Sequence, residues 1–153
     1  MPVIVIGADT AEGAEIVAAL RPKSGEIRVF VSDPDAADRY RGTAKVAIGD
    51  LSDGSHVGGA AIGAFCAVAI VAAAGDDRER HFATSPAAVL LQWADGLRDA
   101  GISRVIAVGA AAELPQPNPL AAAAPEYGFV ETAGKQLSAI AAEVAGLEAA
   151  NIL

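Results

Sequence analysis

The feature that most constrains this chain is its opening stretch, where an apolar run leads into a glycine turn and then a helical pattern. Val3–Ile6 is the apolar run, Gly7 and Gly13 flank the turn, and an Ala-rich segment with apolar residues at helical spacing continues to Leu20. Strand, tight turn and helix in this order open a βαβ unit of the kind that binds dinucleotides. Glycine lets the backbone approach a diphosphate, and the free N–H groups of the helix face its charge.

Two features of the turn depart from the usual dinucleotide pattern. Thr10 stands where a middle glycine is common, and two acids, Asp9 and Glu12, lie inside or beside the turn. Carboxylates near a helix N-terminus stabilise the helix, but they would also repel a bound diphosphate. The sequence therefore predicts the βαβ unit and leaves open whether the turn binds a phosphate or only caps a helix.

Composition excludes several classes of partner. The 153 residues suit one domain, 1–153, and the net charge of -8 argues against nucleic acid or an anionic membrane as a partner, because either would need a basic face. No signal peptide and no apolar run long enough to cross a membrane is visible. The lone Cys66 has apolar neighbours, which predicts a buried, inert thiol in a reducing compartment. We expect a cytoplasmic protein.

The rest of the chain alternates strand and helix patterns. Strands are expected at 27–31, 44–48, 68–72 and 102–109, and helices at 35–40, 54–64, 85–100 and 129–149, with a proline-rich loop at 110–127 and a partial strand at 151–153. The 68–72 run has almost no polar residue, as a central parallel strand covered on both faces should. The pattern predicts a three-layer α/β/α Rossmann-like fold, with a parallel sheet in the order 3-2-1-4-5 and a partial sixth strand.

The tip of the second strand is a candidate ribose site. Asp33 follows Gly13 by twenty residues, the distance at which an acid accepts a hydrogen bond from the adenosine ribose. Asp33 equally suits the N-cap of the helix that begins beside Pro34. Arg39 and Arg41 are less direct candidates for contact with a 2′-phosphate.

A charged loop at 75–81 follows the fourth strand, where a doubly wound sheet has its ligand crevice. His81 in this loop is either functional or part of a solvated surface. Neither His56 nor His81 has a second His or Cys at ligand spacing, so no metal site is expected.

Several segments together resemble the atypical short-chain dehydrogenase/reductase group, in particular the NmrA-like NAD(P)-binding proteins. The resemblance extends over most of the chain, and the segments that carry it are 3–8 with Gly13, 31–34, 49–53, the Ala-rich stretch before Gly75, 100–106, and Lys135 with Glu143.

The resemblance implies NAD or NADP as cofactor and assigns its contacts. Ser32 stands where NADP-preferring relatives have arginine, so the preference stays open, and Asp50 with Leu51 matches the pair that meets the adenine. The full implied set is Gly7, Ala8, Thr10, Ala11, Gly13, Ser32, Asp33, Asp50, Leu51, Ala73 and Ala74.

The resemblance also assigns a catalytic lysine, Lys135, but its partners are missing. The tyrosine expected one helical turn earlier is Glu131, and the serine expected after the fifth strand is replaced by an alanine run at 110–112. Carbonyl reduction needs such a proton donor, so weak or absent reductase activity is expected.

Three hypotheses stay open: an oxidoreductase-derived NAD(P)-binding protein, a non-catalytic dinucleotide-sensing regulator or interaction module, and a domain that binds no nucleotide. The small-molecule substrate cannot be read, and a homodimer is a further expectation of the resemblance.

Overall fold

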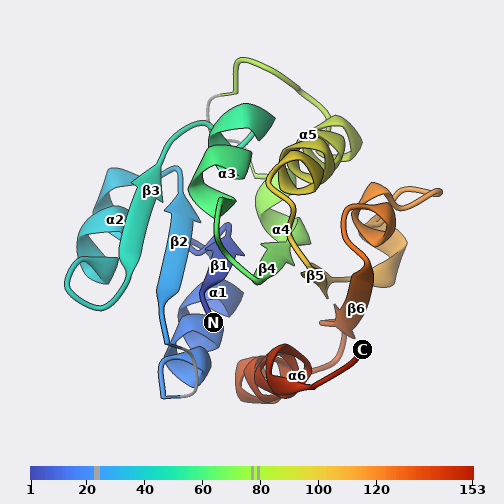
Figure 1. The fold of residues 1–153 in the computed structure, drawn as a ribbon. Coiled ribbons are helices and arrows are strands. Elements are labelled where there is room, and N and C mark those ends of the chain that lie inside the picture. Colours follow the sequence, from blue (N-terminus) through green and yellow to red (C-terminus); the bar gives the residue numbers. More distant parts are fainter. Residues whose placement is uncertain (23–24, 77, 79) are drawn as a thin grey trace.

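A computed structural model describes residues 1–22, 25–76, 78 and 80–153. A parallel six-stranded sheet in the order β3-β2-β1-β4-β5-β6 forms its centre (Figure 1). The strands are β1 (Val3–Ile6), β2 (Ile27–Val31), β3 (Lys45–Ile48), β4 (Cys66–Ile70), β5 (Arg104–Gly109) and β6 (Glu126–Glu131). The helices are α1 (Ala11–Leu20), α2 (Pro34–Tyr40), α3 (Gly54–Ala61), α4 (Val71–Ala74), α5 (Pro86–Asp99) and α6 (Leu137–Ala149), with 3₁₀ turns η1 (Ala111–Glu113) and η2 (Pro119–Ala122).

Helices cover both faces of the sheet. α1, α2 and α6 pack on one face and α3, α5 and η2 on the other, each layer with its own apolar core (Figure 1). Every residue of β1 and β4 is buried, as expected for central strands between two layers. The predicted three-layer Rossmann-like fold and its parallel strand order are confirmed. No helix among the described residues is long and apolar enough to span a membrane.

The sixth strand is present, but it is formed by different residues from those predicted. Glu126–Glu131 pairs in parallel with β5, whereas residues 151–153 form no strand. The helix predicted from residue 129 therefore begins only at Leu137. β6 is an edge strand in which only Val130 is fully buried, so apolar and polar residues do not alternate clearly along it. In addition, Phe129 and Val130 extend the apolar pattern of the following helix toward the N-terminus. Cys66 is buried as expected, and burial raises the pKa of its thiol to about 12.

The glycines of α3 have a packing role. A methyl group added at Gly58 would lie 2.6 Å from the carbonyl oxygen of Gly96, and one at Gly54 would lie 2.3 Å from that of Gln92. The backbones of α3 and α5 therefore approach too closely for any side chain. This contact offsets the low helix propensity of glycine and explains how a glycine-rich segment forms a stable helix.

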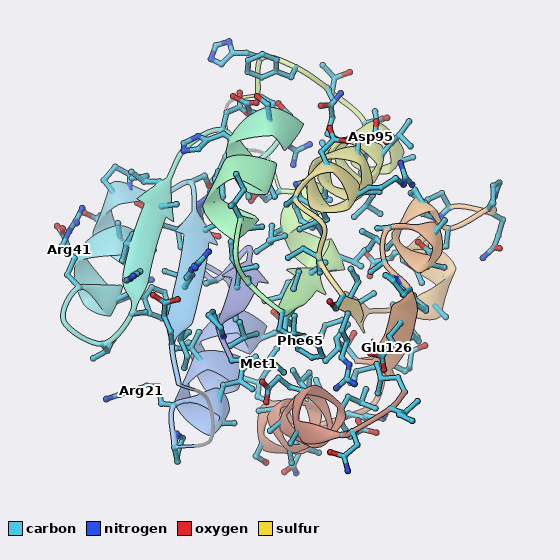
Figure 2. All side chains as sticks on the ribbon, in the orientation of Figure 1. Met1, Arg21, Arg41, Phe65, Asp95 and Glu126 are labelled. Carbon is cyan, nitrogen blue, oxygen red and sulfur yellow. The ribbon has the colours of Figure 1, made fainter. Side chains whose placement is uncertain are left out.

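A buried arginine ties α6 to the sheet. Arg104, the first residue of β5, is fully buried and donates from Nη1 to the carbonyl oxygens of Leu147 (2.9 Å) and Glu148 (3.1 Å). Its Nη2 donates to Glu126 Oε1 at 2.8 Å, and Figure 2 shows Glu126 between β6 and α6. The guanidinium group thus satisfies the last carbonyl groups of the helix, which have no partner within it.

We predict that Arg104→Met lowers the free energy of unfolding by about 3 kcal/mol, because it removes the donor to several carbonyl groups at the end of α6 and the cation that pairs with Glu126. Chemical denaturation monitored by circular dichroism measures this loss. The control is Arg98→Met, since Arg98 is 50% exposed, pairs with Asp95 on the same helix and makes one long hydrogen bond, of 3.4 Å, to the Ala122 carbonyl. The control should change stability by less than about 0.5 kcal/mol. Equal effects of the two substitutions would contradict the assigned role of Arg104.

Candidate functional site at the carboxyl edge of the sheet

The turn between β1 and α1 has the tight geometry that the sequence predicts. Gly7 has a φ of 84°, a left-handed conformation that favours glycine. Thr10 caps α1: its hydroxyl donates to the Gly7 carbonyl at 2.9 Å and accepts from the Gly13 N–H at 3.1 Å. A methyl group at Gly13 would lie 2.6 Å from the Ala8 Cα, so the helix begins directly against the turn. Thr10 therefore closes the turn in place of the middle glycine.

Asp9 joins the turn to the tip of β2. Its side chain is 1% exposed, and its Oδ2 accepts from the backbone N–H and from the hydroxyl of Ser32, both at 2.9 Å. Arg78 lies 3.2 Å from the same oxygen. Oδ2 is thus hydrogen-bonded to the strand tip and paired with a cation, while Oδ1 is buried and has no hydrogen-bond partner among the described residues. Tyr40 also holds the turn, by donating to the Ala8 carbonyl.

Asp33 is the N-cap of α2, which is one of the two roles predicted for it. Its carboxylate accepts from the Asp35 N–H at 3.0 Å at the start of α2. Asp33 also lines a pocket of about 460 Å³, so the ribose interpretation is compatible with the structure. The pocket lies at the ends of β2 and β3 and is lined by Ser32, Asp33, Pro34, Gly49, Asp50, Arg78 and His81.

The loop after β3 holds the charged loop across the sheet edge. Asp50 accepts from the N–H and hydroxyl of Ser52 at 2.8 and 2.6 Å, and from the His81 N–H at 2.7 Å. The Ser52 hydroxyl accepts from the Phe82 N–H at 3.0 Å. Burial by itself raises the pKa of Asp50, but the hydrogen bonds from Ser52 and His81 outweigh it and hold that pKa below its usual value.

Leu51 and the alanines after β4 contribute packing. The Leu51 side chain is buried in the core, and its carbonyl accepts from the indole N–H of Trp93 at 2.6 Å. Ala73 and Ala74 lie in α4, which directly follows β4, and both are fully buried. A methyl group at Gly7 would lie 2.5 Å from the Ala73 Cβ, so α4 and the glycine turn are in close contact.

Lys135 is not on a helix and not beside a tyrosine. It lies in the turn between β6 and α6, where its Nζ pairs with Glu143 at 2.8 Å. The prediction that residues 131 and 135 lie one helical turn apart is wrong, because Glu131 is the last residue of β6. Glu131 accepts from the N–H groups of Ala111, Thr132 and Ala133. These bonds, that of Ala111 foremost, lower the pKa of Glu131, which therefore stays ionised near neutral pH.

The charged loop contributes more to this edge than its composition suggested. Arg78 and His81 line the pocket, and Arg78 reaches Asp9 and Ser32. Asp77 and Glu79 of the same loop lie outside the described residues. The signal for Arg78 was its place after the fourth strand, because loops there line the crevice of a doubly wound sheet. Within the described ranges, no three His, Cys, Asp or Glu side chains are grouped to hold a metal ion.

Known structures share this fold. No family model matches the sequence, and no curated protein matches it. Triphenylmethane reductase from Citrobacter sp. aligns over 99% of this chain and 66% of its own, with a TM-score of 0.77 and 16% identity. The same enzyme complexed with NADP(H) aligns over 85% of this chain and 49% of its own, with a TM-score of 0.66 and 19% identity.

A third neighbour is closer in length. The anaerobillin reductase ChuY from Escherichia coli O157:H7 aligns over 99% of this chain and 92% of its own, with a TM-score of 0.71 and 17% identity. This chain thus spans slightly less than two thirds of triphenylmethane reductase but nearly all of ChuY. At these identities the comparison establishes architecture: the chain has the Rossmann-like fold that these reductases share.

We predict that Asp50→Asn lowers the free energy of unfolding, and that the size of this effect depends on pH. Because the pKa of Asp50 is lowered in the folded state, its carboxylate stabilises the fold above the unfolded pKa of about 3.9, and this contribution is lost as the pH falls through the folded value. At pH 7 the variant should lose about 1–2 kcal/mol through weaker hydrogen bonds. Its unfolding free energy should fall less than that of the wild type between about pH 5 and pH 2.5.

Denaturation series across this pH range measure both effects. Asp95→Asn is the control, since Asp95 is 58% exposed on α5 and its one ion pair among the described residues is with Arg98. Identical acid profiles for Asp50→Asn and the wild type would show that Asp50 does not stabilise the folded edge.

Proposed function

We propose that this protein binds NAD(H) or NADP(H) across the carboxyl edge of its sheet, as a member of the atypical short-chain dehydrogenase/reductase group. The observation that carries the proposal is the adjacency of the Gly7–Gly13 turn to the pocket at the tips of β2 and β3. A dinucleotide has the corresponding parts in the same order, with a diphosphate next to an adenosine. The adenosine half would enter the pocket, beside Ser32, Asp33 and Asp50.

The start of α1 suits a diphosphate. Among the described residues, no acceptor bonds the N–H groups of Ala11 and Glu12, while the Gly13 N–H is satisfied by Thr10. Open N–H groups at the start of a helix favour an anion. The repulsion expected from Asp9 is reduced, because its carboxylate is buried, turned to Ser32 and paired with Arg78. Glu12 is half-buried in the first turn and is the remaining acid there.

The neighbours support a nicotinamide dinucleotide as the ligand. Triphenylmethane reductase has been solved with NADP(H), and a quinone oxidoreductase from Escherichia coli with NADPH. The latter aligns over 71% of this chain with a TM-score of 0.58 and 15% identity.

We infer that the protein lacks the proton relay of a serine–tyrosine reductase. Glu131 and Lys135 stand where the resemblance places the tyrosine and lysine, but the Glu131 carboxylate is bonded to backbone N–H groups and the Lys135 amine to Glu143. Neither side chain is arranged to protonate an alkoxide. A dinucleotide-binding protein without this relay transfers hydride only to acceptors that need no enzyme-bound acid, or serves as a dinucleotide sensor. A cytoplasmic location and a homodimer remain expectations of the same proposal.

Binding is tested by titrating NADH and NADPH while monitoring the fluorescence of Trp93, which is bonded to Leu51 beside the pocket. We predict saturable binding of at least one dinucleotide. Gly13→Ala should weaken it by about tenfold or more, because the added methyl group would collide with the Ala8 backbone and displace the start of α1. Calorimetry with the same ligands provides a second measurement.

Gly59→Ala is the matched control, because a methyl group at this position of α3 would have no neighbour within 4 Å. It should leave the affinity unchanged. Absence of binding of either dinucleotide at millimolar concentration would refute the proposal. If binding is found, reduction of simple ketones that is abolished by Lys135→Ala would show that a proton relay exists after all.

A further inference from the structure

An arginine from another part of the chain lies at the tip of β2, although the tip itself carries a serine. Arg78 belongs to the segment between α4 and α5, and its Nη1 lies 3.4 Å from the Ser32 hydroxyl and 3.2 Å from Asp9 Oδ2. Ser32 is the first residue after β2 and lines the pocket together with Arg78. The guanidinium group therefore stands at the strand tip that faces the adenosine ribose in dinucleotide folds.

Two carboxylates hold this guanidinium group in place. Asp9, almost fully buried, faces Nη1, and Asp76 Oδ2 lies 3.7 Å from Nε. Among the described residues, no acceptor bonds Nη2, and the Arg78 side chain is 36% exposed at the pocket wall. The group is thus fixed on one side and open on the other. A guanidinium group so oriented can donate to a phosphate without losing its anchor.

The other charged groups near the pocket are less suited to bind a phosphate. The carboxylates of Asp33 and Asp50 already accept from backbone N–H groups. Arg41 is 61% exposed, pairs with Asp38 and points outward from α2 in Figure 2. Arg39 is exposed on the same helix and does not line the pocket. Of the described residues that line the pocket, Arg78 is the only one with a permanent positive charge.

We infer that Arg78 is the specificity residue for the adenosine 2′-phosphate, so that the protein binds NADP(H) in preference to NAD(H). This rests on the proposed dinucleotide site and adds to it the residue that sets the preference. Position 32, where NADP-preferring relatives have arginine, is a serine here. Arg78, which lies 46 residues further along the chain, brings a guanidinium group to the same place. Asp9, an unfavourable residue for a phosphate turn when only the sequence is considered, is then the positioning residue that holds Arg78.

Calorimetric dissociation constants for NADPH and NADH test this inference. The wild type should bind NADPH at least tenfold more tightly, a difference of ~1.4 kcal/mol. Arg78→Gln should remove this difference by weakening NADPH at least tenfold more than NADH, because NADH loses only the cation that pairs with Asp9 whereas NADPH also loses its phosphate contact. The matched control Arg41→Gln should keep the full preference. The fragments 2′,5′-ADP and 5′-ADP should show the same pattern, because they differ at the adenosine in the presence or absence of the 2′-phosphate.

Each outcome has a distinct meaning. Equal affinity of the wild type for NADPH and NADH would overturn the role of Arg78 and leave the dinucleotide site standing. A preference that survives Arg78→Gln but disappears in Arg41→Gln would assign the phosphate to α2 and equally overturn it. Absence of binding of either dinucleotide would overturn both the site and the inference. An equal loss of NADPH and NADH affinity in Arg78→Gln would show that the residue supports the pocket as a whole and does not bind the 2′-phosphate.

Discussion

The candidate site depends on the close contact between the glycine turn and the ends of the strands beside it. Gly7 lies against Ala73 of α4, Gly13 lies against Ala8, and neither contact leaves space for a side chain. Asp9 then bonds the turn to Ser32 at the end of β2. These contacts bring three carboxyl ends of parallel strands to one edge, with the start of α1 between them. Such an edge combines backbone N–H groups with a neighbouring pocket, the two features that a diphosphate and an adenosine need.

A network of short polar side chains completes this edge. Asp50 and Ser52, after β3, accept hydrogen bonds from the backbone N–H groups of His81 and Phe82 and so hold these two residues at the sheet edge. The segment that contains them, between α4 and α5, also carries Arg78 to the tip of β2. The acids at this edge are thus mostly hydrogen-bonded to N–H groups or paired with one guanidinium group, which reduces the repulsion that the proposed dinucleotide would meet in an acidic protein.

The sequence was sufficient for the parts of this structure that depend on local pattern. Apolar runs predicted β1 and β2, and the Ser85–Pro86 start with the apolar stripe around Trp93 predicted α5. The fourth strand was predicted at 68–72 and lies two residues earlier, because the apolar run continues without a break from β4 into the buried helix α4. β6 was misplaced because an edge strand leaves a weak trace. The contact between Asp9 and Arg78 could not be predicted, because the two residues are 69 positions apart in the sequence. Local periodicity contains no information about such a long-range pair. Lys135 was placed by resemblance on a helix that begins two residues later.

The central claim is that a dinucleotide occupies the edge between the glycine turn and the tips of β2 and β3. Amide hydrogen exchange with and without saturating NADPH, followed by mass spectrometry, tests it directly, because bound ligand slows the opening of the segments it covers. Slower exchange should appear in peptides that span residues 7–13, 32–34 and 49–52, while peptides of α6 beyond Ile140 should be unchanged. Unchanged exchange in the first three segments under saturating NADPH, or protection confined to a different surface, would contradict the account.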